Sequence, residues 1–204
     1  ELGLVGNGPD DVVGNMDLDR VQGVIDQMAA AGLDIPEGLQ ASDITTNEFI
    51  DESIGLPETA AEAEEEAAVE EEEAAAEEME TVSLADVCPS PIVIQTDWFP
   101  EAEHGALYEM VGDDYVVDTD NKVVRGTLVS SGQDTGVEIE VRTGGPAIGF
   151  QQPIQQMYVE QDITIGYVST NEAVFGAEDT PTLSVVAPLE KNPQIIMWDP
   201  ETYP

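Results

Sequence analysis

The chain has 204 residues, and its 44 acidic against 5 basic residues give it a formal net charge of −39. Five basic residues cannot neutralise a row of phosphates, so the sequence excludes a nucleic-acid-binding surface as the main function. The strongly negative net charge also excludes binding to anionic membrane surfaces. The apolar fraction of 41% is close to that of an ordinary globular chain, so we expect part of the chain to bury a core.

One cysteine, Cys88, excludes an internal disulfide and a cysteine-based metal site. No run of about 18 apolar residues occurs, and no pattern typical of a signal peptide opens the sequence. Both ends of the sequence fall within patterned segments. We therefore expect a fragment or a processed piece of a longer protein.

Residues 1–57 contain a predicted helix that begins near Asp17 and stops at Gly32, a residue type favoured at helix ends. Its apolar residues repeat at helical spacing. A second short element is expected at 42–50. The segment holds too little apolar surface for an independent fold, and we interpret it as the end of a domain.

Residues 58–80 contain twelve Glu and eight Ala, without a single basic residue. Carboxylates at i,i+3 and i,i+4 repel one another on a helix. The composition predicts a disordered, self-repelling acidic linker over 58–87. A calcium-binding loop is not favoured, since the alternating Asp or Asn and the glycine of such loops are missing.

A peptide spanning 58–80 should gain helix when it is acidified. Its glutamates lose their charge below about pH 4, near their usual pKa of about 4.3, and the repulsion then disappears. Circular dichroism measures the change. An unchanged spectrum between neutral and acidic pH would contradict repulsion as the cause.

Residues 88–204 change to an alternation of short strands and helices. The predicted strands are 92–94, 115–117, 123–124, 137–141, 163–168, 183–186 and 194–197, of which the second and third form a hairpin. The predicted helices are 104–111, 147–158 and 171–175. This alternation favours an α/β fold with a parallel sheet, in which ligands bind beyond the carboxyl ends of the strands.

The first strand is followed by Asp97, Trp98 and His104, which combine an aromatic surface with ionisable groups. Such a combination is typical of a ligand site. The structural alternative is that Trp98 belongs to the core, His104 caps a helix and Asp97 caps a turn. The sequence leaves both interpretations open.

Two further strand ends offer small or polar groups. Gly144 and Gly145 lie between a strand and a helix, where backbone N–H groups can approach a ligand. Gly-Gly-Pro also simply forms turns. The next strand is also followed by small or polar residues at the start of a helix, namely Thr170, Asn171 and Glu172. Three consecutive strand ends of this kind favour a binding site there.

Nucleophilic catalysis finds no support, because the chain has one histidine and no motif around any serine. A paired-carboxylate hydrolase stays open, although the abundance of acids makes each one uninformative. We expect no enzyme, no metal and no cofactor.

Several segments of 88–204 occur in an order that resembles a known family. The run from Ile92 to Pro100, followed by 104–108, resembles the start of the extracytoplasmic solute-binding proteins of ABC importers. Their nitrate/sulfonate/taurine and thiamine-pyrimidine-precursor group begins with such a strand, an Asp-Trp-x-Pro turn and a helix opened by histidine. The segments 144–146, 166–174, 181–189 and 191–194 are similar to later strand ends and strands of the family.

The resemblance implies an incomplete lobe of the periplasmic-binding-protein type II kind at 88–204, with a parallel-rich sheet. Residues 1–57 resemble the C-terminal helix and tail of the same family, so the chain would carry a tail, the 58–87 linker and the first lobe of a second domain. The hairpin near Asp120 replaces the family's longer first helix. A closed cleft would need a second lobe that is absent from this chain.

The function implied by the resemblance is capture of a small polar or heteroaromatic solute for an ABC permease, outside the cytoplasm, with the full-length protein periplasmic or at the cell surface and membrane-associated. Trp98 would stack on the solute. The other expected ligand-binding residues are Asp97, His104, Gly144, Gly145, Thr170, Asn171 and Glu172. The alternatives are a pyrimidine-precursor biosynthetic enzyme on the same fold, against which the missing cysteine-rich motif counts, and a tethered cell-surface interaction module.

Overall fold

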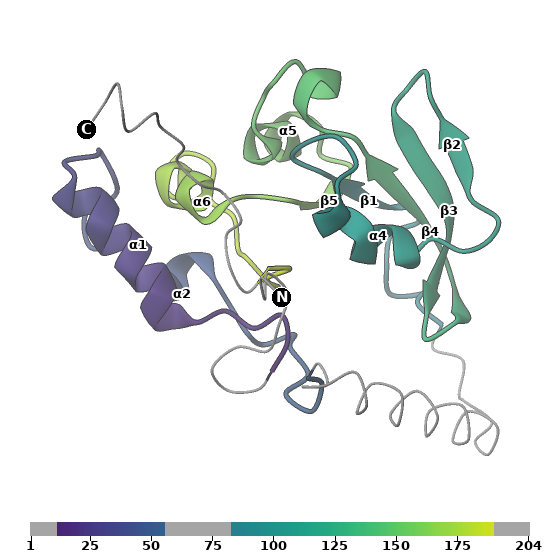
Figure 1. Cartoon of the computed structure of the whole chain (residues 1–204), viewed down its shortest axis with the longest axis horizontal. Helices are drawn as coiled ribbons and strands as arrows, with labels where there is room; N and C mark the ends of the chain where they lie inside the picture. The colour runs from purple at the N-terminus through teal and green to yellow at the C-terminus, as the bar shows by residue number, and fades with distance from the viewer. Residues whose placement is uncertain (1–11, 56–82, 190–204) are drawn as a thin grey trace, which may run out of the picture.

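The computed structural model describes residues 12–55 and 83–189 (Figure 1). The acidic run 58–80 and the expected strand 194–197 lie outside the described residues. Among the described helices, none combines the length and the apolar character that crossing a bilayer requires.

The centre of the fold is a five-stranded sheet in the order β2-β3-β4-β1-β5. β1 lies between β4 and β5 and is parallel to both, while the pairs β2–β3 and β3–β4 are antiparallel. The strands are β1 (Ile92–Gln95), β2 (Val116–Asp118), β3 (Val123–Ser130), β4 (Gln133–Arg142) and β5 (Ile163–Gly166). The α/β class is confirmed, whereas the sheet is mixed rather than parallel-rich.

The alternating pattern of β4 explains how the sheet builds its core. Val137, Ile139 and Val141 are each at most 2% exposed and point to one face, as period-two alternation requires. Ile139 and Val141 pack with Ile94 of β1 and with Leu107. Leu107 belongs to α4 (Gly105–Glu109), which follows the short 3-10 helix η1 (Ala102–His104). α4 thus covers this face of the sheet.

The antiparallel part of the sheet was only partly predicted. The hairpin between 115–117 and 123–124 is confirmed as β2–β3, but β3 continues to Ser130 and returns as β4. Ser131 and Gly132 make this turn with φ of 49° and 70°, the left-handed pair that favours tight hairpins. Residues 125–130 were not predicted as a strand.

Three other predicted elements are shorter or divided in the structure. The helix expected at 147–158 is two elements, η2 (Gly145–Ile148) and α5 (Pro153–Val159), separated where Gly149 and Phe150 have positive φ. β5 ends at Gly166 rather than at 168. The expected strand 183–186 is reduced to a single bridge between Ser184 and Thr45.

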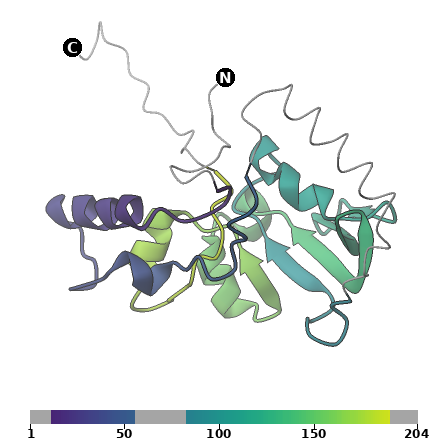
Figure 2. The same ribbon diagram turned by 90° about the horizontal axis from the view of Figure 1, so that it is seen from below.

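The N-terminal segment 12–55 packs against the end of the described chain (Figures 1 and 2). It contains α1 (Leu18–Ala30), whose N-cap Asp17 accepts a hydrogen bond from the backbone of Arg20 at 3.0 Å, and α2 (Ala41–Ile44). α6 (Thr170–Gly176) shares a core with both helices. The buried members of this core are Ile25, Met28, Ile44, Ala173 and Val174.

Truncating this shared core should destabilise the whole protein. Ile44 is 2% exposed, so Ile44→Ala should cost about 2–5 kcal/mol of unfolding free energy. Ile54 is 55% exposed, and the matched Ile54→Ala should change little. Urea denaturation measures both. Equal, small losses would show that the segment does not pack on α6 in solution.

Candidate functional site

The carboxyl ends of three parallel strands meet at one edge of the sheet. In the register, Gln95 at the end of β1 lies beside Arg142 of β4 and Gly166 of β5. After β1, the chain builds β2, β3 and β4 on one side of β1 and then crosses to form β5 on the other side. Such a reversal of strand order is where open α/β sheets bind ligands. The loops that follow these strands therefore form the candidate site.

Hydrogen bonds join the loops after β1 and β4. Thr96 is fully buried, and its Oγ1 accepts from the backbone N–H of Gly144 at 3.1 Å. The same hydroxyl lies 2.8 Å from the carbonyl oxygen of Trp98 and 3.1 Å from that of Arg142, and it donates to the nearer one. The N–H of Gly145 donates to the carbonyl of Asp97 at 3.0 Å. These bonds fix the position of Trp98 beside the end of β4.

The two glycines allow the loops to approach this closely. A Cβ on Gly144 would lie 2.1 Å from the carbonyl oxygen of Thr96, and a Cβ on Gly145 would lie 2.8 Å from the Trp98 ring. Gly145 also has a positive φ of 58°, which favours glycine. The N–H groups of both glycines already donate to protein acceptors. In the structure, the two glycines therefore serve to let Trp98 pack closely against this loop. The predicted ligand hydrogen bonds from these residues stay a prediction.

Three exposed aromatic side chains form a patch at this edge, called here the aromatic patch: Trp98, Phe99 and Phe150. The ring of Trp98 lies 6.1 Å from that of Phe99 and 5.8 Å from that of Phe150, between ring centroids. Trp98 is 41% exposed, so it is not a core residue, and both phenylalanines are also exposed. Contiguous exposed apolar surface of this kind is typical of binding sites.

A second group lies next to Trp98 along the chain and centres on His104, whose ring is fully buried. Its Nδ1 accepts from the backbone N–H of Glu101 at 3.3 Å, and its Nε2 lies 2.9 Å from Oδ1 of Asp97. An accepting Nδ1 places the ring proton on Nε2, which then donates to Asp97. The ring also meets that of Tyr167 edge-on, with 4.9 Å between centroids. His104 therefore orients Asp97, whose side chain stays 46% exposed.

Glu103 completes what we call the acidic group, Asp97, Glu103 and His104. One ligand atom from each of these residues lies within 4.8 Å of the others. Burial raises the pKa of Glu103, and the negative charges of Glu101 and Asp97 raise it further. Burial also raises the pKa of Tyr167, with contributions from Asp97 and Glu103. The acidic group is therefore a site of concentrated negative charge.

A carboxylate–imidazole set of this kind has donor atoms that suit a metal ion. The hydrogen bonds argue against ligation by His104, however, because Nε2 carries the proton and Nδ1 accepts from the backbone. Ligation needs a free nitrogen lone pair and a partner that accepts from the other nitrogen. The group as folded fits a hydrogen-bonding role for the imidazole better than a metal-binding role.

The third strand end leads into the capped helix α6. Glu172 accepts a hydrogen bond from the backbone of Ser169 at 3.2 Å and forms the capping box of α6. Thr170 and Asn171 are exposed at the start of this helix. Among the described contacts, none joins these three residues to Trp98 or to the acidic group. The structure therefore brings Asp97, Trp98, His104, Gly144 and Gly145 together, without contact to the α6 residues.

Four residues of the site were not predicted from the sequence: Glu103, Tyr167, Phe150 and Phe99, the last of which directly follows Trp98. Glu103 directly precedes His104, and Tyr167 directly follows a parallel strand, as Thr96 does, so both carried a positional signal. Phe150 carried none, because its place beside Trp98 depends on the left-handed φ of 61° after η2.

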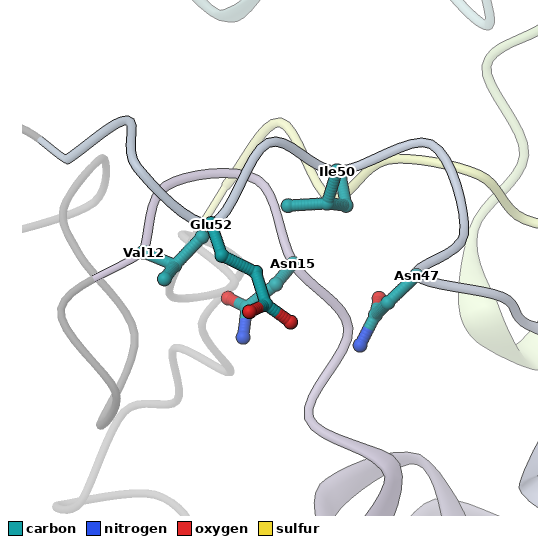
Figure 3. A pocket seen from close by; sticks show the side chains of 5 residues that line it. All are labelled: Val12, Asn15, Asn47, Ile50 and Glu52. Carbon is teal, nitrogen blue, oxygen red and sulfur yellow. The ribbon is translucent and has the colours of Figure 1, made fainter.

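A separate pocket of about 340 Å³ lies in the N-terminal part of the fold (Figure 3). Its lining residues are Val12, Asn15, Asn47, Ile50 and Glu52. The amide of Asn47 is occupied by two hydrogen bonds with the backbone of Met16. No aromatic ring lines the pocket, and it contains none of the expected site residues. We therefore favour the strand-end loops, where aromatic and ionisable groups converge.

No family model matches the chain, and searches of curated proteins and of solved structures found no match either.

Proposed function

We propose that this chain is the solute-capturing component of an ABC importer, acting outside the cytoplasm. The observation that carries the proposal is the seating of Trp98 on Gly145, with the ring exposed at the carboxyl ends of three parallel strands. This is the edge at which open α/β sheets bind small molecules.

The chemistry of the edge supports a binding role. A preformed site needs an apolar surface and a few fixed polar groups. The aromatic patch supplies the apolar surface, and the Asp97 carboxylate, held by His104, supplies a fixed polar group. The imidazole is buried and bonded at both nitrogens, so it is poorly placed to act as a general base on a substrate.

The remaining parts of the proposal rest on the family resemblance of residues 88–204. They are a permease as the membrane partner, a periplasmic or cell-surface location, and closure of the site by a second lobe. Until a second lobe covers the bound solute, capture by this chain is expected to be weak, because one lobe buries only one side of the ligand.

Thermal unfolding with a panel of small cationic, neutral and anionic solutes tests the proposal. A solute at about 100 times its dissociation constant stabilises the protein by about 2.7 kcal/mol, which is visible as a raised melting temperature. We expect stabilisation by at least one class of solute. The proposal fails if none of them stabilises the protein even at millimolar concentrations, or if a hit is turned over into product.

A further inference from the structure

We propose that the outer side of β2 docks an extended segment of a partner protein, apolar at its centre and flanked by lysine or arginine. The segment would add a sixth strand to the sheet, the mode of peptide recognition known as strand addition. The docking surface comprises Val116, Val117 and Asp118. β3 lies between this surface and β4, so the inference concerns a second site and stands independently of the proposed function.

The first observation is that β2 has an open side. It is the last strand of the sheet on its side, and its inner side pairs with β3 (Figure 1). In an antiparallel pair, alternate residues direct their N–H and C=O groups away from the partner strand. Among the described residues, none forms a backbone hydrogen bond with Val116 or Val117 outside the β2–β3 ladder. Such a strand offers unpaired donors and acceptors to another strand.

The second observation is that the centre of this surface is apolar. Val116 is 58% exposed and Val117 is 55% exposed, and their side chains lie on opposite faces of the strand. Outermost strands of natural sheets commonly carry a charge that prevents pairing with another chain. Here two β-branched apolar residues occupy the middle of the strand instead. An added strand would therefore bury apolar surface on both faces while its backbone pairs with β2.

Two carboxylates held in place by hydrogen bonds bracket the valines. Asp114 accepts from the backbone N–H and the hydroxyl of Thr127, at 3.0 and 2.8 Å. Asp118 accepts from the backbone N–H groups of Asn121 and Asp120, at 2.9 and 3.1 Å. These bonds, from Thr127 to the first and chiefly from Asn121 to the second, lower the pKa of both carboxyls. The valines therefore lie between two negative charges at neutral pH.

The bases of the hairpin leave these charges without a salt bridge. Lys122 donates to the carbonyl of Thr119 at 2.6 Å, and Arg125 binds Glu140 at 3.4 Å. In the described part of the chain, neither base forms a salt bridge with the two carboxylates. A positively charged partner thus meets complementary charge at both ends of the apolar centre, and this complementarity defines the chemistry of the occupant.

The same charges argue against a second copy of this chain as the occupant. Antiparallel pairing of two β2 strands centred on Val116 would set Asp114 of one copy opposite Asp118 of the other. Like charges directly opposite each other destabilise a strand pair. The net charge of −39 on each copy adds a general repulsion. Lysine or arginine at the facing positions would convert both contacts into attractive pairs.

The test compares three short peptides of equal length on the full 204-residue chain. The first alternates valine and threonine and has lysines at both ends; the second has glutamates in place of the lysines; the third keeps the lysines but has a central proline. NMR titration at about 0.15 M salt measures their affinities. We expect the first peptide to bind at least about tenfold more tightly than either of the others, a difference of about 1.4 kcal/mol. Glutamates repel the two carboxylates, and proline cannot donate to a strand ladder.

The same titration locates the contact. The amides of residues 116–118 should shift and should exchange more slowly with solvent when the lysine-flanked peptide binds. The amides of Thr96 and Gly145, which belong to the strand-end loops, should stay unmoved. This readout separates strand addition at β2 from binding at the proposed solute site.

Two variants and a matched control test the residues themselves. Val117→Lys places a repelling charge on the docking surface and should weaken the lysine-flanked peptide at least about tenfold. Val159→Lys adds the same charge at a position that is 73% exposed on α5, which packs against β5 at the other side of the sheet, and should leave the affinity within about twofold. Asp118→Asn keeps an oxygen acceptor for the turn and should reduce the preference for lysines over glutamates. Circular dichroism confirms that each variant is folded.

Several results would overturn the inference. Equal binding of the proline-containing peptide would mean that charge alone attracts the peptides. Shifts confined to other parts of the chain would place the contact elsewhere. A dimer in sedimentation that Val117→Lys abolishes would make a second copy the occupant. If no peptide binds at millimolar concentration, the two carboxylates serve only to keep this side of the sheet unpaired. The proposed solute-binding function stands or falls separately in each case.

Discussion

Among the glycines of the described residues, Gly144 should be the least tolerant of alanine, and Gly144→Ala should cost about 3 kcal/mol or more of unfolding free energy. The added Cβ would lie 2.1 Å from the carbonyl oxygen of Thr96 and 2.6 Å from the carbonyl carbon of Asp97. Both obstacles are backbone atoms, so no side chain can rotate away to relieve the overlap. The loops after β1 and β4 would have to separate and lose the hydrogen bonds that join them.

Chemical denaturation of this variant and of Gly23→Ala provides the comparison. Gly23 lies inside α1, and nothing lies within 4 Å of an added Cβ there. The same change at this position should stabilise the protein by roughly 0.5–1 kcal/mol, because alanine favours the helix. If Gly144→Ala were as stable as the wild type, the two loops would not touch as described.

Trp98→Ala should affect stability and binding in very different proportions. Complete burial of a tryptophan would make its truncation cost about 3–5 kcal/mol, but Trp98 is 41% exposed, so the melting temperature should fall only slightly. Solute affinity should fall at least about tenfold, because a stacked aromatic ring supplies much of the contact area.

Tyr115→Ala is the matched control for this split. Tyr115 is 58% exposed next to the edge strand β2, away from the strand ends of the site. Its truncation should leave both stability and affinity nearly unchanged. A large loss of stability with unchanged affinity in Trp98→Ala would make Trp98 a packing residue and remove the centre of the proposed site.

The sequence predicted those elements whose pattern is local. β1, β4 and the β2–β3 hairpin follow from short apolar runs and period-two alternation, and α1 follows from its cap and apolar stripe. The rule that ligand sites form at the carboxyl ends of parallel strands also predicted that Asp97, Trp98, His104 and Gly145 lie near one another. The contacts of Trp98 with Gly145 and of Asp97 with His104 agree with this prediction.

The parts that the sequence did not reveal depend on long-range pairing. The extension of β3 is stabilised by β4, and its own residues carry a weak alternation signal. The packing of α1 and α2 on α6 joins residues that are far apart in sequence, which no periodicity reports. The carboxylate of Glu172 caps α6, because a glutamate three residues after Ser169 satisfies the free backbone donor. Its expected contact with ligand stays a prediction.

The central claim is that solute binds at the carboxyl ends of β1, β4 and β5, and amide chemical-shift mapping during a solute titration tests it most directly. The account predicts that the perturbed amides cluster at Thr96–Trp98, Gly144–Gly145 and Tyr167, with the side-chain N–H of Trp98 among them. Perturbations gathered instead around Asn47 and Glu52, the residues of the separate pocket, with the strand-end amides unmoved, would contradict it.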